Sequence, residues 1–457
     1  MAASDDLLHT LRTWGRQPAG ALRTRLQVSR ATLMRAVQAL GPALVVRGQA
    51  RHTTYAARRA LRGSMAPLPL YRVDARGMAH EAGLLHPLHP AGCMFDGAAG
   101  LGWPLDGAMQ QGWFDGLPFL LDDMRPQGFL GRHFARHHAA LMQVADDPTA
   151  WSEDDVLQVL SLLGADQPGD CILGDGALRL WQAQALQPPA ALPDAAIAAA
   201  YPALADRAMA QGVAASSAGG EFPKFTALRL LAGAPCHVLV KFSGSDASAG
   251  TQRWADLLVC EHLALGVVAS TLQLPASASQ IHVAGGRCFL EVQRFDRHGL
   301  RGRSAVCAWA ALNAGLFGLA GQPWPRAAAA LHARSLVDAA TASAITRLWH
   351  FGQLIANTDM HDGNLAFRPG LQLAPVYDML PMLYAPQRGV ELPARRFAPA
   401  LPLPGERADW ALAAQAALQF WQLASSDGRI SAGLRATAAE NAQTVADLQR
   451  LAGGPRA

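Results

Sequence analysis

Lysine is nearly absent from this chain of 457 residues: only Lys224 and Lys241 are lysines among the 39 basic side chains, and the other 37 are arginines. The six cysteines form no C-x-x-C pair, which argues against a zinc or redox motif. The run Ala305–Pro325, which has neither charged residues nor histidine, contains polar residues and two prolines, so we expect a buried helix there and no membrane span. The acidic start at Ser4–Asp6 is unlike a signal peptide, and we expect a cytoplasmic protein with reduced thiols.

Charge is scarce but unevenly distributed. Charged residues make up 16% of the chain and hydrophobic residues 51%, which at this length indicates two or three globular domains. Residues 1–65 hold eleven arginines and only two acids, Asp5 and Asp6, which gives about +9; the rest must carry about −5, since the whole is +4. A basic block on a mildly acidic body is typical of a nucleic-acid-binding module joined to an enzyme.

The basic block has the periodicity of a small folded domain. Apolar spacing predicts helices at Asp5–Gly15, Pro18–Leu26 and Arg30–Leu40, and two strands at Ala43–Arg47 and His52–Ala56. This order is that of a winged helix-turn-helix. The alternative is a three-helix bundle that binds a protein partner.

We expect the third helix of this block to contact the phosphates and base edges of DNA. Ser29 is a good N-cap, and Leu33, Met34, Val37 and Leu40 are expected to face inward. The outer face and the wing then supply donors for phosphates and base edges. The residues that we expect to contact DNA are Ser29, Arg30, Thr32, Arg35, Gln38, Arg47 and Arg51.

The segment Asn357–Asp378 carries the clearest chemical motif. Asp359 and Asn364 are five residues apart, and Asp378 follows an apolar run. Phosphoryl transfer to a hydroxyl uses a carboxylate that orients the attacking oxygen, and an amide and a second carboxylate that hold Mg²⁺. Protein kinases space their catalytic Asp and metal-binding Asn in the same way.

Both lysines lie upstream of this motif, in the order that a kinase would use. Lys241 ends an apolar strand, His237–Lys241, and Lys224 follows a Gly-rich turn at residues 217–223. A compact ammonium is suited to contacts with phosphate. Arg253–Leu265 predicts a helix that carries Glu261 and Asp256, and we expect Asp256, like Asp362, to be exposed to solvent.

These pieces, taken in order, resemble the HipA family of bacterial toxin kinases over roughly residues 70–430. The matching segments are Ser216–Gly220, Lys224–Leu228, His237–Lys241, Glu261, Val292–Arg297, Asn357–Asn364 and Tyr377–Asp378. The fused DNA reader resembles the YjjJ-type branch of that family. The implied fold class is α+β: an N-terminal winged helix-turn-helix joined to a HipA-like, two-lobed, protein-kinase-like body with a mostly helical C-terminal lobe. The implied parts are residues 1–65, 66–193 (an N-terminal subdomain), 194–297 (a small kinase lobe) and 298–457 (a helical kinase lobe).

The resemblance also implies roles and partners. It implies an ATP- and Mg²⁺-dependent serine/threonine protein kinase, a protein substrate such as an aminoacyl-tRNA synthetase and a HipB-like antitoxin, while the winged helix favours a homodimer. Asp359 would be the catalytic aspartate, and Ser216 or Ser217 the site of autophosphorylation, which would eject the loop by its charge. Asn364 and Asp378 would hold the metal. The residues expected to bind the nucleotide are Gly219, Gly220, Lys224, Lys241, Glu261, Val292, Gln293, Phe295 and His361, of which His361 is better explained as a structural hydrogen-bonding residue.

Three other functions remain open from the sequence. The motif is close to that of small-molecule kinases such as aminoglycoside and choline phosphotransferases. The chain could also be a DNA-binding transcriptional regulator whose kinase body senses nucleotide or is inactive. A metal-dependent nuclease would use the carboxylates but would leave the lysines and the glycine loop unexplained.

Overall fold

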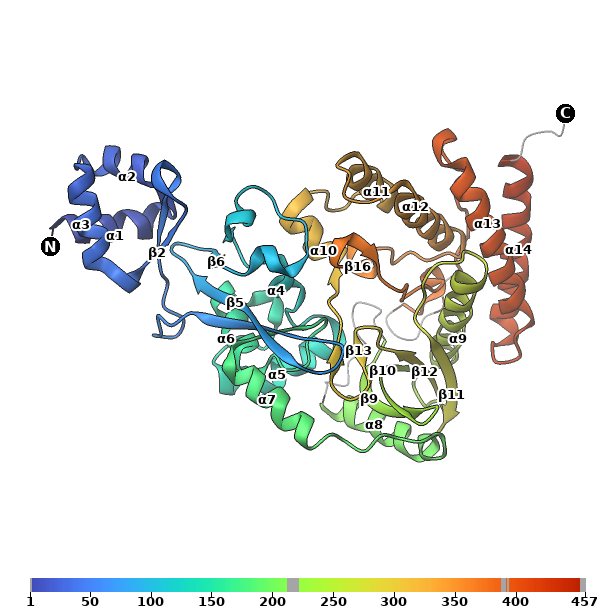
Figure 1. The fold of residues 1–457 in the computed structure, drawn as a ribbon. Coiled ribbons are helices and arrows are strands. Elements are labelled where there is room, and N and C mark those ends of the chain that lie inside the picture. Colours follow the sequence, from blue (N-terminus) through green and yellow to red (C-terminus); the bar gives the residue numbers. More distant parts are fainter. Residues whose placement is uncertain (1, 212–221, 388–391, 393, 453–457) are drawn as a thin grey trace.

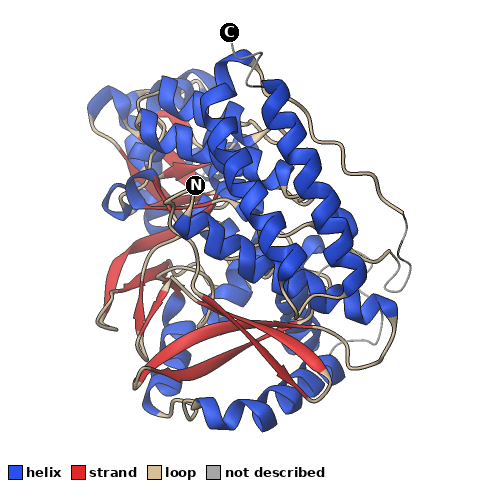
Figure 2. Ribbon diagram, turned by 90° about the vertical axis from the view of Figure 1, so that its right-hand side faces the viewer, coloured by secondary structure: helices blue, strands red, loops and turns tan. Residues whose placement is uncertain are grey.

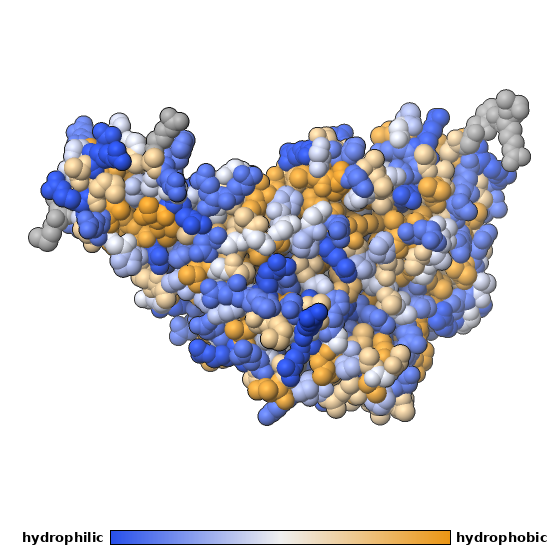
Figure 3. All heavy atoms as spheres, viewed as in Figure 1, coloured by the Kyte–Doolittle hydropathy of each residue, from blue (hydrophilic) through white to orange (hydrophobic). Residues whose placement is uncertain are grey.

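The computed structural model describes residues 2–211, 222–387, 392 and 394–452. The chain forms an elongated body, and an N-terminal lobe projects from one end of it (Figures 1 and 3). Among the described residues, no helix is both long and apolar enough to span a membrane.

The N-terminal lobe consists of three helices and a small antiparallel sheet with the strand order β1-β3-β2. The helix α3 begins where the sequence predicts, because the Ser29 side chain accepts a hydrogen bond from the Thr32 backbone N–H at 3.2 Å. One expectation is wrong: Met34 is 47% exposed, and Ala36 takes the inward position beside Leu33. The elements are α1 (Ala2–Trp14), β1 (Gln17–Pro18), α2 (Ala19–Leu26), α3 (Arg30–Leu40), β2 (Leu44–Arg47) and β3 (Thr54–Ala57).

This lobe is docked on the next sheet by backbone and side-chain contacts. The Arg59 N–H donates to the Pro87 carbonyl and the His89 N–H to the Ala57 carbonyl, each at 2.9 Å. An apolar cluster also spans the junction, made of Val45, Ala56, Leu88, Met94 and Trp113.

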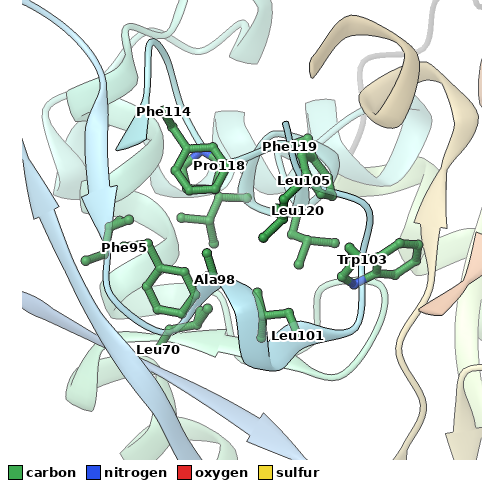
Figure 4. Close-up of a pocket in the computed structure, with 12 residues that line it drawn as sticks. Leu70, Phe95, Ala98, Leu101, Trp103, Leu105, Phe114, Pro118, Phe119 and Leu120 are labelled. Carbon is green, nitrogen blue, oxygen red and sulfur yellow. The ribbon is translucent and has the colours of Figure 1, made fainter. Parts of the chain in front are cut away.

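Residues 66–186, which we call the middle region, form a five-stranded sheet of order β7-β6-β5-β4-β8 with four helices. Its apolar interior encloses a cavity of about 20 Å³ lined by side chains such as Phe95, Trp103 and Phe119 (Figure 4). The volume is close to that of a single water, and the lining offers no polar partners, so the cavity is a packing defect of the core. The elements are β4 (Leu68–Val73), β5 (Ala79–Pro87), β6 (Cys93–Phe95), β7 (Trp113–Phe114), α4 (Phe119–Asp123), α5 (Gly128–Met142), α6 (Glu153–Leu163), β8 (Cys171–Leu173) and α7 (Gly174–Leu186).

A four-stranded antiparallel sheet of order β11-β12-β10-β9 follows, with a helix on each face (Figure 2). One face packs on α8 through a cluster that includes Tyr201, Val240 and Phe289, and the other packs on α9 through residues such as Leu257 and Leu290. The elements are α8 (Ile197–Gln211), β9 (Lys224–Leu231), β10 (Ala234–Phe242), α9 (Ala249–Ser270), β11 (Ser279–Ala284) and β12 (Arg287–Gln293).

The rest of the chain is mostly helical and packs against α9 through α13. The apolar run before Asp378 contains only the two strand residues of β17. A π-helical turn, Asn313–Phe317, interrupts the predicted helix at 305–325. The elements are β13 (Arg297–His298), β14 (Gly302–Arg303), β15 (Cys307–Ala308), α10 (Trp309–Leu312), α11 (Trp324–Ala333), α12 (Ala339–Leu354), β16 (Ala366–Arg368), β17 (Gln372–Leu373), α13 (Arg407–Ser426) and α14 (Ala432–Ala452).

Candidate functional site

Strand alternation aims Lys241 at the helix α9. Val238, Val240 and Phe242 of β10 belong to the cluster under α8, so the residue between the last two points to the opposite face. There the Lys241 ammonium lies 2.8 Å from both carboxylate oxygens of Glu261. It also contacts Oδ1 of Asp378, which comes from the helical lobe. One buried cation therefore joins both lobes.

The three charges perturb one another. Burial lowers the pKa of Lys241, but the Asp378 and Glu261 carboxylates raise this pKa by more than burial lowers it. The pKa of Lys241 therefore lies above its ordinary value. Burial raises the pKa of Glu261, and Lys241 only partly offsets this effect. For Asp378, burial raises the pKa, but Lys241 and then Lys224 bring it below the usual value. Asp378 therefore stays ionised, as a metal ligand must.

The Asp359 loop is built by short-range hydrogen bonds. The Asp359 N–H donates to the Asn357 side chain at 3.0 Å, and the Asn364 amide donates to the Asp359 carbonyl at 2.8 Å. His361 caps the short turn before Asn364 by accepting from the Gly363 N–H, also at 3.0 Å. Over half of the Asp359 side chain is exposed, so its carboxylate is open to an incoming hydroxyl.

Two contacts hold the Asp378 loop against the Asp359 loop. The Tyr377 hydroxyl donates to the Gly363 carbonyl at 2.7 Å, and the Asn357 amide donates to the Asp378 carbonyl at 3.3 Å. Asp378 has a left-handed backbone with φ 55°, a conformation that costs about 1–3 kcal/mol in a non-glycine residue. Such strain is common where a structure fixes a functional side chain. Tyr377 and Asn357 were not singled out from the sequence, although both lie inside its clearest motif.

We call residues 292–297, at the end of β12 and just after it, the hinge segment, because in a protein kinase the corresponding backbone lies against the adenine. Part of this backbone is hydrogen-bonded inside the protein. Val292 is buried and pairs with strands on both sides. The Gln293 N–H donates to Ala278, 2.8 Å away, so this N–H is not available to an adenine. The Phe295 ring stacks on Tyr377 with centroids 6.1 Å apart.

The glycine loop falls partly outside the described residues. Ser216, Ser217, Gly219 and Gly220 all lie there. Lys224 is the first residue of β9, where it pairs in register with Lys241.

The two residues before Lys224, Phe222 and Pro223, have structural roles. Phe222 is buried against Trp254 of α9. The Pro223 carbonyl accepts from the Phe242 N–H, so the edge pairing of β10 continues beyond β9.

Two expectations about acidic residues are wrong. Asp256 is fully buried, because it accepts hydrogen bonds from the backbone N–H and hydroxyl of Ser431 ahead of α14. Asp362 accepts from the buried Asn313 amide at 2.9 Å and is only half-exposed. Both partners are distant in sequence, so no local pattern identifies these contacts.

The expected DNA-contacting side chains lie on one face of α3 and in the hairpin. Arg30, Arg35 and Gln38 are exposed, while Ser29 and Thr32 bond to each other at 3.0 Å. Arg47 donates to the Asp96 carbonyl at 3.4 Å, and Arg51 lies in the turn Ala50–His52 between the hairpin strands. The outer face of α3 therefore presents three exposed side chains of this set.

Comparison with known proteins fits this arrangement. Residues 64–182 match the model of the YjjJ-like toxin middle domain, and residues 216–450 match the HipA-like C-terminal domain. The chain is 37% identical over 440 residues to Toxin YjjJ of Escherichia coli (strain K12), which covers 95% of this chain and 96% of that protein. The chain belongs to the HipA/YjjJ family of toxins.

The HipA fold extends to a solved structure. A chain of the Shewanella oneidensis MR-1 toxin–antitoxin complex of HipA, HipB and operator DNA matches with a TM-score of 0.51 at 14% identity. The match covers 84% of this chain and 96% of that one. At this identity the likeness concerns the fold.

The donor set of this HipA-type site suits a hard cation. The Asn364 amide nitrogen is engaged by the Asp359 carbonyl, which leaves the side-chain oxygen as the group that Asn364 presents. Together with a carboxylate oxygen of Asp378 it offers the oxygen ligands that Mg²⁺ prefers, with the remaining positions left for water and phosphate. Among the described residues no group of three or more His, Cys, Asp or Glu side chains could hold a metal by itself.

Proposed function

We propose that this chain is an ATP- and Mg²⁺-dependent serine/threonine protein kinase of the HipA toxin type. One observation carries the proposal: the buried Lys241 contacts Glu261 and Asp378 from two lobes, beside a loop that presents Asp359 and Asn364. This is the set of groups that positions the phosphates and the metal in protein kinases. A structural ion pair alone would leave the exposed carboxylate of Asp359 without a role.

The transfer follows from these positions. The acceptor hydroxyl hydrogen-bonds to the Asp359 carboxylate, which orients the oxygen toward the γ-phosphorus and takes the proton. The new O–P bond forms in line as the bond to the β–γ bridging oxygen breaks, and ADP leaves. Lys241 offsets charge on the phosphates. Mg²⁺, held by Asn364 and Asp378, would supply further neutralisation of the developing charge.

We assign the acceptor in the absence of another protein to Ser216 or Ser217. Phosphate there adds nearly two negative charges, and repulsion from the acidic groups of the site would expel the loop and stop the enzyme. For a protein acceptor in trans, we favour an aminoacyl-tRNA synthetase, as for the family.

Residues 1–65 are proposed to be a winged helix-turn-helix that binds DNA, with α3 in the major groove. The support is the charge of about +9 and the exposed polar face of α3, where Arg35 would contact a phosphate. Replacement of Arg35 by alanine is expected to weaken binding to all DNA sequences alike and to reduce the salt slope by about 1.

The remaining assignments concern partners and location. The solved relative is a complex with HipB and operator DNA, which supports a HipB-like antitoxin as a partner here. Operator half-sites read by such folds are commonly bound by dimers, so we propose a homodimer. All six cysteines are free thiols, in keeping with the cytoplasm.

The experiment that tests the kinase is incubation with γ-labelled ATP and Mg²⁺, followed by mass spectrometry of residues 205–230. The samples are the wild type, Asp359→Asn and Asp447→Asn; the control residue is an exposed aspartate on α14, paired with Arg450. We expect phosphate on Ser216 or Ser217 in the wild type and the control only.

Other outcomes separate the alternatives. ATP binding without protein phosphorylation, but with transfer to choline or an aminoglycoside, would indicate a small-molecule kinase. ATP binding with no transfer to any acceptor would indicate a regulator that senses nucleotide. Label in Asp359→Asn equal to the wild type would refute the role of Asp359.

A further inference from the structure

The loop of the middle region that follows α6 contacts the hinge segment. Asp166, just beyond the C-terminal end of α6, pairs with Arg294 at 3.1 Å and with Arg297 at 2.8 Å. Asp296 accepts from the Gly169 N–H at 3.0 Å, and Arg297 donates to the Gly169 carbonyl at 2.9 Å. Both arginines and Asp296 are nearly buried, so the hinge is fixed from outside the kinase lobes.

A second contact of the middle region reaches the catalytic loop. Asp123, the last residue of α4, accepts a hydrogen bond from the Ala308 N–H of β15 at 3.1 Å. β15 pairs with β16, which begins two residues after Asn364, and the Trp309 N–H donates to the Leu365 carbonyl at 2.7 Å. The Asp123 carboxyl is thus linked to the backbone that carries the metal-binding amide.

Asp123 shares its surroundings with acidic and weakly acidic groups. The titratable groups that face it are Asp122 on its own helix, the Cys307 thiol on β15 and, farther away, Tyr377. Among the described residues no ion pair involves Asp123. Burial raises its pKa to about 7, and the neighbouring Asp122 adds to the effect.

The two contacts are connected through Phe295, Tyr377 and the catalytic loop. Phe295, between the two clamped arginines, stacks on Tyr377, and the Tyr377 hydroxyl bonds to Gly363 of the catalytic loop. The middle region therefore contacts both ends of this series of contacts. At one end it binds the arginines on either side of Phe295, and at the other it binds β15, which pairs with the strand that follows the catalytic loop.

We infer that the middle region is a working part of the kinase site, in which Asp166 positions the hinge and Asp123 positions the catalytic loop. The inference rests on the proposed kinase function. Neither residue touches the reacting atoms; each acts through the segment that it holds. The two roles are distinguishable, because the hinge meets the nucleotide base whereas the catalytic loop meets the transferred phosphate.

The hinge role predicts a change in KM for ATP. Asp166→Asn keeps the shape of the side chain but removes its charge from two arginines. The Asp166 side chain is 52% exposed, so its ion pairs are screened and the rise in KM should be at most about fivefold, with kcat unchanged. Asp175→Asn is the control, an aspartate of the same region that bonds to the Tyr71 hydroxyl away from the hinge.

The catalytic-loop role predicts a change in kcat. Asp123→Ala leaves the Ala308 N–H without its acceptor, and kcat should fall about tenfold while KM for ATP stays constant. Asp123→Asn keeps an acceptor oxygen and should restore most of kcat. Asp122→Asn, which loses only a 3.1 Å pair with Arg125, is the neighbouring control.

The pH dependence of the melting temperature tests the surroundings of Asp123 without a measurement of catalysis. Since the folded-state pKa of Asp123 lies above its ordinary value of 3.8, the folded protein retains a proton that the unfolded chain releases. This stabilisation is present below pH 3.8 and is lost as the pH rises to about 7. The melting temperature of Asp123→Asn relative to the wild type should therefore rise between pH 4 and 7. That of Asp122→Asn should rise less, because this variant keeps the Asp123 carboxyl and removes only a charge that raises its pKa.

The outcomes separate this inference from the proposed function. If the wild type binds ATP with Mg²⁺ in calorimetry but transfers no phosphate, the dissociation constant replaces KM, and Asp166→Asn should still raise it. Equal constants for Asp166→Asn and Asp175→Asn, or equal kcat for Asp123→Ala and the wild type, would refute the positioning roles alone. Absence of ATP binding by the wild type would refute the proposed function and this inference with it.

Discussion

Replacement of Lys241 by methionine tests whether the buried charges depend on one another. Methionine fills a similar volume but leaves Glu261, which is fully buried, without the ammonium at 2.8 Å. Removing one partner of a buried ion pair costs about 3–5 kcal/mol, a large part of the roughly 5–15 kcal/mol that stabilises a typical domain. Urea unfolding at pH 8 should show this loss. Arg450→Met, which breaks an exposed pair with Asp447, should cost less than about 1 kcal/mol.

The pH dependence follows from the direction of the Glu261 shift. Its folded-state pKa is already raised by burial, and loss of Lys241 must raise it further. A raised carboxyl pKa contributes stability at low pH that is lost as the pH rises, so the cost of Lys241→Met should be smaller at pH 5 than at pH 8.

A second substitution makes the test specific. Adding Glu261→Gln removes the unpaired charge, so Lys241→Met/Glu261→Gln should be more stable at pH 8 than Lys241→Met alone, by about 2 kcal/mol. The Asp378 side chain is 33% exposed, so this carboxylate should contribute little to the difference. Equal unfolding free energies for the single and double variants, or a cost that does not change with pH, would refute the reasoning.

Three further predictions concern single contacts. Tyr377→Phe loses the hydrogen bond to Gly363 and should lower the unfolding free energy by about 1 kcal/mol and reduce phosphate transfer, measured by urea unfolding and by label incorporation. Asp256→Ala leaves the Ser431 N–H and hydroxyl without an acceptor and should destabilise the helical lobe by about 1–3 kcal/mol, measured by the same unfolding assay. Arg59→Ala breaks two ion pairs with the start of α6 and should make the N-terminal lobe more sensitive to limited proteolysis, with no such effect on the helical lobe.

Local rules account for the elements that were predicted well. Ser29 fixes the start of α3 because the cap lies three residues from its donor, and the alternation of apolar residues in β10 determines which face Lys241 occupies. Within the site, the resemblance assigned both Lys241 and Glu261 to the nucleotide, and the structure brings the two side chains together.

Long-range contacts account for what the sequence did not reveal. Asp256 bonds to a residue 175 positions away, Asp166 to one 128 positions away, and Asp123 to one 185 positions away. Each of these aspartates looks like an ordinary polar helix or loop residue, since its partner comes from another region of the chain. Met34 was misplaced for a related reason: several positions of α3 could face inward, and packing on α1 and β3 selects Ala36.

The helix α6 fixes the position of the N-terminal lobe relative to the hinge segment. Glu153 and Asp154 at its start, where the helix dipole favours negative charge, pair with Arg59 at 3.0 and 2.9 Å. The helix has 11 residues and is about 16 Å long, and three residues after its end the chain reaches Asp166 at the hinge. An apolar cluster and backbone hydrogen bonds reinforce the same junction, so no flexible linker intervenes. If residues 1–65 bind DNA as proposed, binding would therefore set the direction in which the kinase cleft faces, in addition to holding the enzyme at the site.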